Sequence, residues 1–99
     1  MPLEALPGGR ARLPEHVVHR DFQEETVVLN LETGQYHGLN PTARRMLEAV
    51  VDADSLALAV TALEAEFAVP RARLERDLVD LCAALVVRGL LQFDDAQAA

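Results

Sequence analysis

The stretch of residues 29–47, LNLETGQYHGLNPTARRML, constrains the fold most, because its pattern changes from strand to turn, back to strand and then to helix. It overlaps the β-branched run TVVLNL, which is typical of a strand, and Gly34 can adopt the positive φ that a hairpin loop requires. Asn40 and Pro41 then mark a helix start, because the asparagine side chain can accept a hydrogen bond from a free amide and proline suits the first helical position. A hairpin that leads directly into a helix predicts an α+β fold.

The length of the hairpin loop decides which side chains share a face of the sheet. If the loop is residues 32–34, cross-strand partners share a face, and the expected pairs are Leu31 with Gln35, Leu29 with His37, and Val27 with Leu39. The expected core face is then Val27, Leu29 and Leu39, and the other face is Val28, Asn30, Tyr36 and Gly38. A two-residue loop shifts this assignment by one. Tyr36 has two interpretations: it packs across the sheet against Val28 and Val17, or it lines a groove.

The rest of the chain divides into elements by shorter signals. Residues 1–14 carry prolines and a Gly-Gly pair without a sustained period, so they are predicted to be a flexible tail, as are residues 94–99. HVVHRDF reads as a first strand. Three helices are expected: Pro41 to about Val51; from Asp54 or Ser55, with Leu56, Val60, Leu63 and Phe67 on one face; and from Pro70 to Gly89. We therefore predict one domain, residues 15–93, in which a three-stranded antiparallel sheet precedes three helices.

The third predicted helix carries two neighbouring apolar stripes. One consists of Leu74, Leu78, Leu81 and Leu85, and the other of Val79, Cys82 and Val86. This apolar arc is wider than contact with one neighbouring element needs. The LLQF segment that follows Gly89 is short, and we expect it to pack back on the core as an extended piece.

Charge and composition exclude several classes of function. The 99 residues suit a single domain, and nine arginines against sixteen acids give a net charge of −7, which disfavours binding to phosphate backbones. Arg71, Arg73 and Arg76 form a basic cluster, but Glu75, Asp77 and Asp80 interleave with them and cancel its potential. No apolar run approaches the roughly 20 residues of a membrane span. We expect a cytoplasmic protein that binds neither nucleic acid nor membrane.

The residue types that usually carry catalysis do not form a pattern here. His16 and His19 are three residues apart on a predicted strand, which puts them on opposite faces, and His37 lacks a second ligand cluster. Cys82 lies mid-helix in an apolar stripe, as a buried small hydrophobe would. PGGRAR lacks the lysine, the threonine and the preceding strand of a phosphate loop. We expect no enzymatic activity, no metal and no cofactor.

The order of these elements resembles the PqqD-like family, the RiPP recognition elements, over residues 15–93. The motifs that carry the resemblance are an aliphatic strand, the turn ETGQY, LN before a helix bearing Met46 and Leu47, and a last helix ending in RGLL. The resemblance implies a small winged-helix-like domain that binds the leader segment of a ribosomally made precursor peptide. TGQYHGLNPTA looks most like the stand-alone leader-binding proteins of lasso-peptide pathways. The sequence departs from relatives in lacking an aromatic residue in the first helix and in its strong acidity.

What the resemblance implies for the site is strand addition, a mode in which an extended peptide pairs with an exposed sheet edge. The leader would pair antiparallel with residues 35–39 and lie between that strand and the third helix. The expected peptide-binding residues are Gln35, Tyr36, His37, Gly38 and Leu39 on the strand, and Arg73, Leu74, Asp77, Leu78 and Leu81 on the helix. A separate leader peptidase and an ATP-dependent macrocyclase are the other expected partners.

Two alternatives remain open at this point. The same fold could serve as a peptide chaperone of another RiPP pathway, or of a pathway that makes a cofactor from a precursor peptide. A winged-helix domain could also bind DNA through Arg71, Arg73 and Arg76, although that function would need a basic face.

Overall fold

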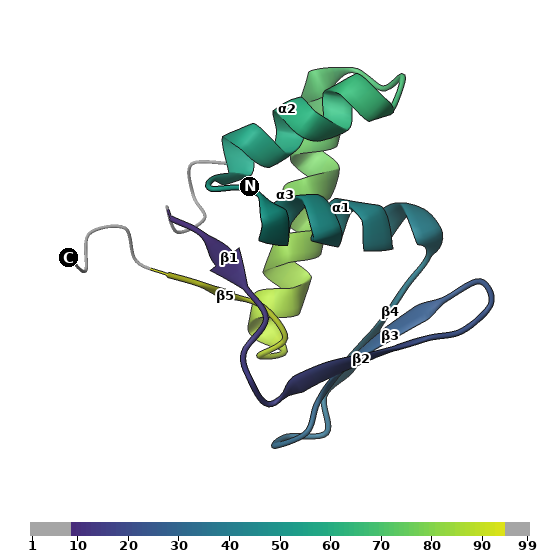
Figure 1. Ribbon diagram of the computed structural model, residues 1–99, viewed down its shortest axis with the longest axis vertical. Helices are drawn as coiled ribbons and strands as arrows, with labels where there is room; N and C mark the ends of the chain where they lie inside the picture. Colours follow the sequence, from purple (N-terminus) through teal and green to yellow (C-terminus); the bar gives the residue numbers. More distant parts are fainter. Residues whose placement is uncertain (1–8, 95–99) are drawn as a thin grey trace.

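The computed structural model describes residues 9–94; residues 1–8 and 95–99, which belong to the two predicted tails, lie outside the described part. Three strands form an antiparallel sheet in the order β2-β3-β4, and three helices follow along the chain (Figure 1). The elements are β2 (Val17–Asp21), β3 (Thr26–Asn30), β4 (Tyr36–Leu39), α1 (Pro41–Asp52), α2 (Leu56–Glu66) and α3 (Arg71–Val87). The predicted fold class is confirmed.

A second, two-stranded sheet joins the two ends of the described chain. It pairs β1 (Ala11–Arg12) with β5 (Gln92–Phe93), and the guanidinium of Arg12 contacts the Asp94 carboxylate at 2.9 Å. The predicted tail was to run to residue 14, but Ala11 is only 3% exposed and Pro14 is also buried. From residue 11 onwards, the tail prediction is therefore wrong. β5 agrees with the extended piece expected after Gly89.

The register of the hairpin differs from the expected one by a single residue. The observed partners are Thr26 with Leu39, Val27 with Gly38, Val28 with His37, and Leu29 with Tyr36. Val28 is therefore on the core face and is 1% exposed, together with buried Thr26, Asn30 and Leu39, whereas Val27 and Leu29 are half-buried on the outer face. A slip of one residue moves every side chain of the slipped strand to the opposite face. The predicted faces were therefore wrong for residues 27–30 of β3, and they are confirmed for Tyr36, Gly38 and Leu39 of β4.

The side chain of Asn30 explains this register. Its Oδ1 accepts hydrogen bonds from the backbone N–H groups of Glu32 and Thr33, at 2.9 and 3.1 Å, which forms a local turn. The Asn30 C=O accepts from the Gly34 N–H at 2.8 Å, and its N–H donates to the Gln35 C=O at 2.8 Å. The loop therefore consists of four residues, 31–34, in place of the three that were expected.

The helix boundaries agree with the capping signals in the sequence. Asn40 Oδ1 accepts from the Ala43 N–H at 2.8 Å and Ser55 Oγ accepts from the Leu58 N–H at 3.2 Å, so α1 and α2 begin where predicted. After α3 the chain turns at Gly89, whose φ of +69° favours glycine. A Cβ at residue 89 would lie 2.9 Å from Asn30 Nδ2, so glycine also permits a close approach of the hairpin.

A single aliphatic core lies between the sheet and the three helices. Its fully buried members include Val28, Leu39, Val50, Val60, Leu63, Leu78, Cys82, Leu85 and Leu90. Burying side chains of this kind contributes roughly 1.5–3 kcal/mol each. Within residues 9–94, no helix has both the length and the hydropathy needed to cross a membrane.

Candidate functional site

β4 is the last strand of the three-stranded sheet and pairs with β3 along one side. Hydrogen-bonded pairs alternate along an antiparallel ladder. The bond from the Asn30 N–H to the Gln35 C=O therefore places the N–H and C=O groups of His37 and Leu39 on the side of β3 as well. The N–H and C=O groups of Tyr36 and Gly38 point the other way, to the free edge. This edge offers two donors and two acceptors to an extended segment of another chain.

The side chains of β4 divide between the two faces of the sheet. His37 is half-buried and Leu39 fully buried on the inner face, against the helices. Tyr36 is 65% exposed on the outer face, opposite Leu29. The interpretation that Tyr36 packs against Val28 and Val17 is therefore wrong, because Val28 points to the inner face. Gln35 precedes the strand; its N–H donates to Thr33 Oγ1 at 3.2 Å.

The predicted α3 residues divide between core and surface. Leu74 and Leu78 are buried in the core, Leu81 is half-buried, and Arg73 and Asp77 are exposed and form an ion pair at 3.8 Å. Val79 and Cys82 of the second stripe are buried as well. The wide apolar arc of α3 is thus used mostly inside the protein. In this conformation Leu81 is the predicted leucine that reaches the surface.

A hollow of about 500 Å³ lies where the hairpin meets the end of α3. Its lining residues are Asn30, Thr33, Gln35, Val87, Arg88 and Gly89. Asn30 holds the two sides together, because its Nδ2 donates to the Gly89 C=O at 3.1 Å. Apart from Gln35, these residues were missed as site residues. A possible signal was the arginine directly before the glycine stop, since cations favour helix C-termini.

Arg88 and His37 set the electrostatics of this region. Arg88 is half-buried, and its Nη1 donates to the Ala84 C=O at 3.2 Å. Burial lowers the pKa of His37 below its ordinary value, and the nearby charge of Arg88 lowers it further. His37 therefore favours its neutral form, and the positive charge at this end of β4 comes from Arg88.

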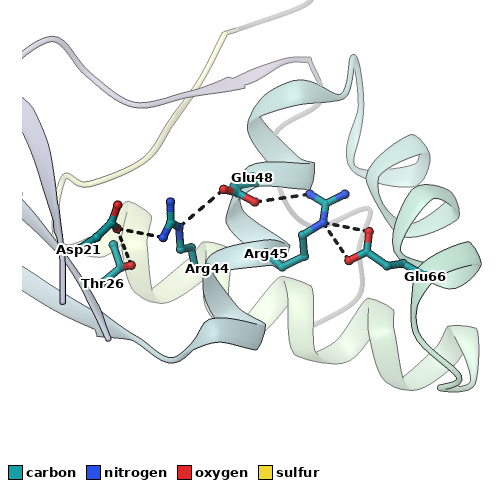
Figure 2. A network of polar contacts seen from close by, with 6 residues as sticks. All are labelled: Asp21, Thr26, Arg44, Arg45, Glu48 and Glu66. Atoms are coloured by element: carbon teal, nitrogen blue, oxygen red, sulfur yellow. Dashed lines mark hydrogen bonds and ion pairs between the residues drawn. The ribbon is translucent and has the colours of Figure 1, made fainter. Parts of the chain in front are cut away.

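A second hollow, of about 420 Å³, lies between the inner face of the sheet and α1, and its lining includes His19 of β2, Leu39 of β4 and Arg44 of α1. Figure 2 shows the polar network beside it, in which Arg44 of α1 contacts Asp21 of β2 at 3.2 Å and Glu48 at 3.6 Å. Thr26 donates to the same Asp21 carboxylate at 2.8 Å. Arg45 then binds both carboxylate oxygens of Glu66 at 2.9 Å, which ties α1 to α2. Asp21, Arg44 and Glu48 beside the β2 edge are thus already paired with one another.

The described residues offer little to catalysis or to metal binding. In residues 9–94, no group of three or more His, Cys, Asp or Glu side chains could hold a metal ion. Burial raises the pKa of the Cys82 thiol to about 12, so this thiol does not ionise near neutral pH and is a poor nucleophile.

Comparisons with known proteins give one family and two similar structures. The family model described as "Coenzyme PQQ synthesis protein D (PqqD)" matches residues 25–91. A structure described as "TbiB1 in Complex with the TbiA(beta) Leader Peptide" is 33% identical, with a TM-score of 0.72, and the match covers 85% of this chain and 99% of that one. A "Lasso peptide synthetase B1 complexed with the leader peptide" is 28% identical, with a TM-score of 0.74 and coverage of 84% and 98%. No curated protein matches the chain.

Proposed function

Since this chain belongs to the PqqD family, we propose that it is a non-catalytic RiPP recognition element that binds the leader segment of a precursor peptide. The observation that carries the proposal is the free edge of β4, with the outward N–H and C=O groups of Tyr36 and Gly38. Two similar proteins were solved as complexes with leader peptides, which supports the same role here.

In the proposed mode, the leader adds to β4 as an antiparallel strand. Four backbone hydrogen bonds at a net 0.5–1.5 kcal/mol each contribute roughly 2–6 kcal/mol. Ordering a disordered peptide costs about 2–5 kcal/mol or more. The free energy gained by strand pairing is therefore almost cancelled by the cost of ordering the peptide. Two or three apolar side chains of the leader, at roughly 1.5–3 kcal/mol each when buried, must supply the net affinity.

The proposed contact residues fall into three groups. Gln35 to Leu39 supply the backbone edge, with Tyr36 available to side chains of the leader that point to the outer face. Leu81, Arg73 and Asp77 form the α3 side of the site. Leu74 and Leu78 lie behind it in the core, so we propose that they support α3 from within. A direct contact with them would require α3 to move.

We further propose that the protein delivers the bound leader to a separate leader peptidase, and the core peptide to an ATP-dependent macrocyclase, in lasso-peptide biosynthesis. The similarity to a lasso peptide synthetase B1 favours this pathway. The family description favours a second candidate, a peptide chaperone in the maturation of a cofactor from a precursor peptide. Both use the same edge of the sheet, and the identity of the precursor distinguishes them.

The DNA-binding alternative receives no support from the arginines that it would use. Arg71 pairs with Glu64 at 3.1 Å and with Glu75 at 3.3 Å, and Arg73 pairs with Asp77. Within residues 9–94, Arg76 is then the one arginine of the three without a carboxylate partner. Charges that are already paired on the surface offer little to phosphates, and the net charge of −7 adds repulsion.

The proposal can be tested with a display library of linear random peptides, followed by titration of a labelled binder. We expect saturable binding, and we expect the amide protons of Tyr36 and Gly38 to exchange more slowly with solvent in the complex. The amides of His37 and Leu39 face β3 and serve as internal controls. Failure to select any saturable binder, or protection confined to the β2 amides of His19 and Asp21, would overturn the proposal.

A further inference from the structure

We propose that the hollow at the end of α3 is a specificity subsite for a carboxylate side chain of the bound peptide, with Arg88 as the cation that recognises it. This inference rests on the proposed function and deepens it, because it assigns a chemical class to one residue of the guest.

Most arginines of this protein form ion pairs with acidic side chains of the same chain. All nine lie in the described residues, and six of them have a carboxylate oxygen within 4.0 Å: Arg10, Arg12, Arg44, Arg45, Arg71 and Arg73. For the other three, Arg20, Arg76 and Arg88, residues 9–94 provide no such partner. Arg20 and Arg76 are exposed, whereas Arg88 is half-buried and lines a hollow. Arg88 therefore combines an unneutralised charge with a shaped site.

The guanidinium of Arg88 has capacity for a ligand. It carries five N–H donors, and its Nη1 donates to the Ala84 C=O. The planar group matches a carboxylate through two parallel hydrogen bonds, and partial burial makes such a pair stronger than one in water. Carbonyls at the end of α3 would repel an anion, but those of Leu85 and Val86 already accept from the Leu90 and Gly89 N–H groups.

The remaining lining suits an acidic side chain with an apolar stem. Asn30, Thr33 and Gln35 contribute polar groups, and Val87, which is 85% exposed, contributes an apolar wall. Elsewhere the net charge of −7 disfavours acidic ligands. A peptide carboxylate is therefore favoured in this hollow and disfavoured along most of the surface. Contact between that carboxylate and Arg88 would thus select both the presence of an acidic residue and the register in which the peptide pairs with β4.

The hollow also predicts where in the guest the acid lies. Gln35 lines the hollow, and it lies on the same face of the sheet as His37 and Leu39, the face that packs against the helices. In an antiparallel added strand, the residue opposite Gln35 shares that face and lies at the C-terminal end of the paired segment. We therefore expect Asp or Glu at the C-terminal end of the segment that pairs with β4.

The test repeats the linear-peptide selection on the intact protein and on two matched variants. Arg88→Glu reverses the charge in the hollow, and Arg76→Glu makes the same change in net charge at an exposed arginine of the same helix. Wild type and Arg76→Glu should both enrich Asp or Glu at one position near the C-terminal end of the paired segment, and Arg88→Glu should enrich Lys or Arg there. Replacing the acid of one binder by its amide should weaken binding about ten-fold in wild type, and less than about two-fold in Arg88→Gln.

Each outcome of the selection has a distinct meaning. Peptides that bind saturably without an acidic preference, or an acidic preference that survives Arg88→Glu, overturn the subsite and leave the proposed function intact. If Arg76→Glu loses the acidic preference to the same extent as Arg88→Glu, the preference reflects net charge, and the subsite is overturned as well. A selection that yields no binders overturns both the proposed function and the inference that rests on it. Arg88→Gln, which adds no repulsion, serves as the second variant if Arg88→Glu does not fold.

Discussion

The two free edges of the three-stranded sheet differ in the side chains that protect them. On β2, the N–H of Val17 is bound to the Pro14 C=O at 2.9 Å, and the Asp21 carboxylate is held by Thr26 and Arg44 (Figure 2). Charged side chains on an edge strand discourage pairing with other chains. β4, with the sequence YHGL, carries no Asp, Glu, Lys or Arg. Charged side chains thus protect one edge of the sheet against pairing, whereas the other edge carries none.

The largest expected effect concerns Asn30, which joins the β4 hairpin to the end of α3. Replacing it by alanine removes three hydrogen bonds, so Asn30→Ala should lower the free energy of unfolding by about 2–4 kcal/mol. Urea unfolding followed by circular dichroism measures this. The control is Asn40→Ala, which removes one exposed cap and should cost about 1 kcal/mol. Equal costs for the two variants would show that Asn30 does not anchor the β4 side.

The second prediction compares the two edges directly by removing one outward N–H from each. Gly38→Pro should weaken binding of a selected peptide at least about ten-fold, because it deletes a donor and places a ring in the path of the added strand. Gly38→Ala is the matched control: its Cβ also meets the Glu25 carboxylate, at 3.1 Å, but the donor remains. His19→Pro makes the corresponding change on β2 and should leave affinity unchanged. The comparison fails if His19→Pro weakens binding as much as Gly38→Pro.

The third prediction concerns the ion pairs that protect β2. Both side chains of the Arg44–Asp21 pair are 43% exposed, so Arg44→Gln should lower the free energy of unfolding by only about 0.2–1 kcal/mol. This difference should shrink in 1 M salt, which screens exposed charges. Thermal unfolding of both proteins at low and high salt provides the measurement. A cost that is unchanged by salt would indicate that Arg44 acts through packing.

The smallest expected effect is the pH dependence that His37 contributes. Its pKa is lowered in the folded state, so the unfolded chain binds more protons between that pKa and 6.5. The stability of the wild type relative to His37→Gln should therefore fall as the pH is lowered from 7 to 5. Arg88→Gln should weaken this dependence, because it removes the second cause of the shift. A wild type that gains stability over His37→Gln on acidification would contradict the assignment.

The sequence signals that predicted the fold were local, and the structural features that they predicted correctly, the helix ends, were local as well. Asn40 and Pro41, Ser55, and Gly89 each act on backbone groups within a few residues, and the helices begin and end at or next to them. The pairing of β1 with β5 joins segments about eighty residues apart and only two residues long. No periodicity can appear in two residues, so the sequence offered no basis for this pairing.

The site was predicted less well, for two physical reasons. The register depended on whether Asn30 would hydrogen-bond with its own loop, a choice that the alternation of apolar residues does not contain. The apolar arc of α3 indicated that its side chains would be buried, but not whether the core or a bound peptide would bury them. Leu74 and Leu78 lie in the core of the protein. The hollow lined by Arg88 was missed because it forms only where the hairpin meets the end of α3, a contact that is known only once the chain is folded.

The ribbon of β1 and β5 has a practical consequence for measurement. The N–H of Asp94 donates to the C=O of Arg10 at 2.8 Å, and in Figure 1 this corner lies well apart from β4. Arg10 and Asp94 thus lie next to each other, on the side of the protein away from β4. A label placed at residue 10 or at residue 94 should therefore leave peptide binding at β4 unobstructed.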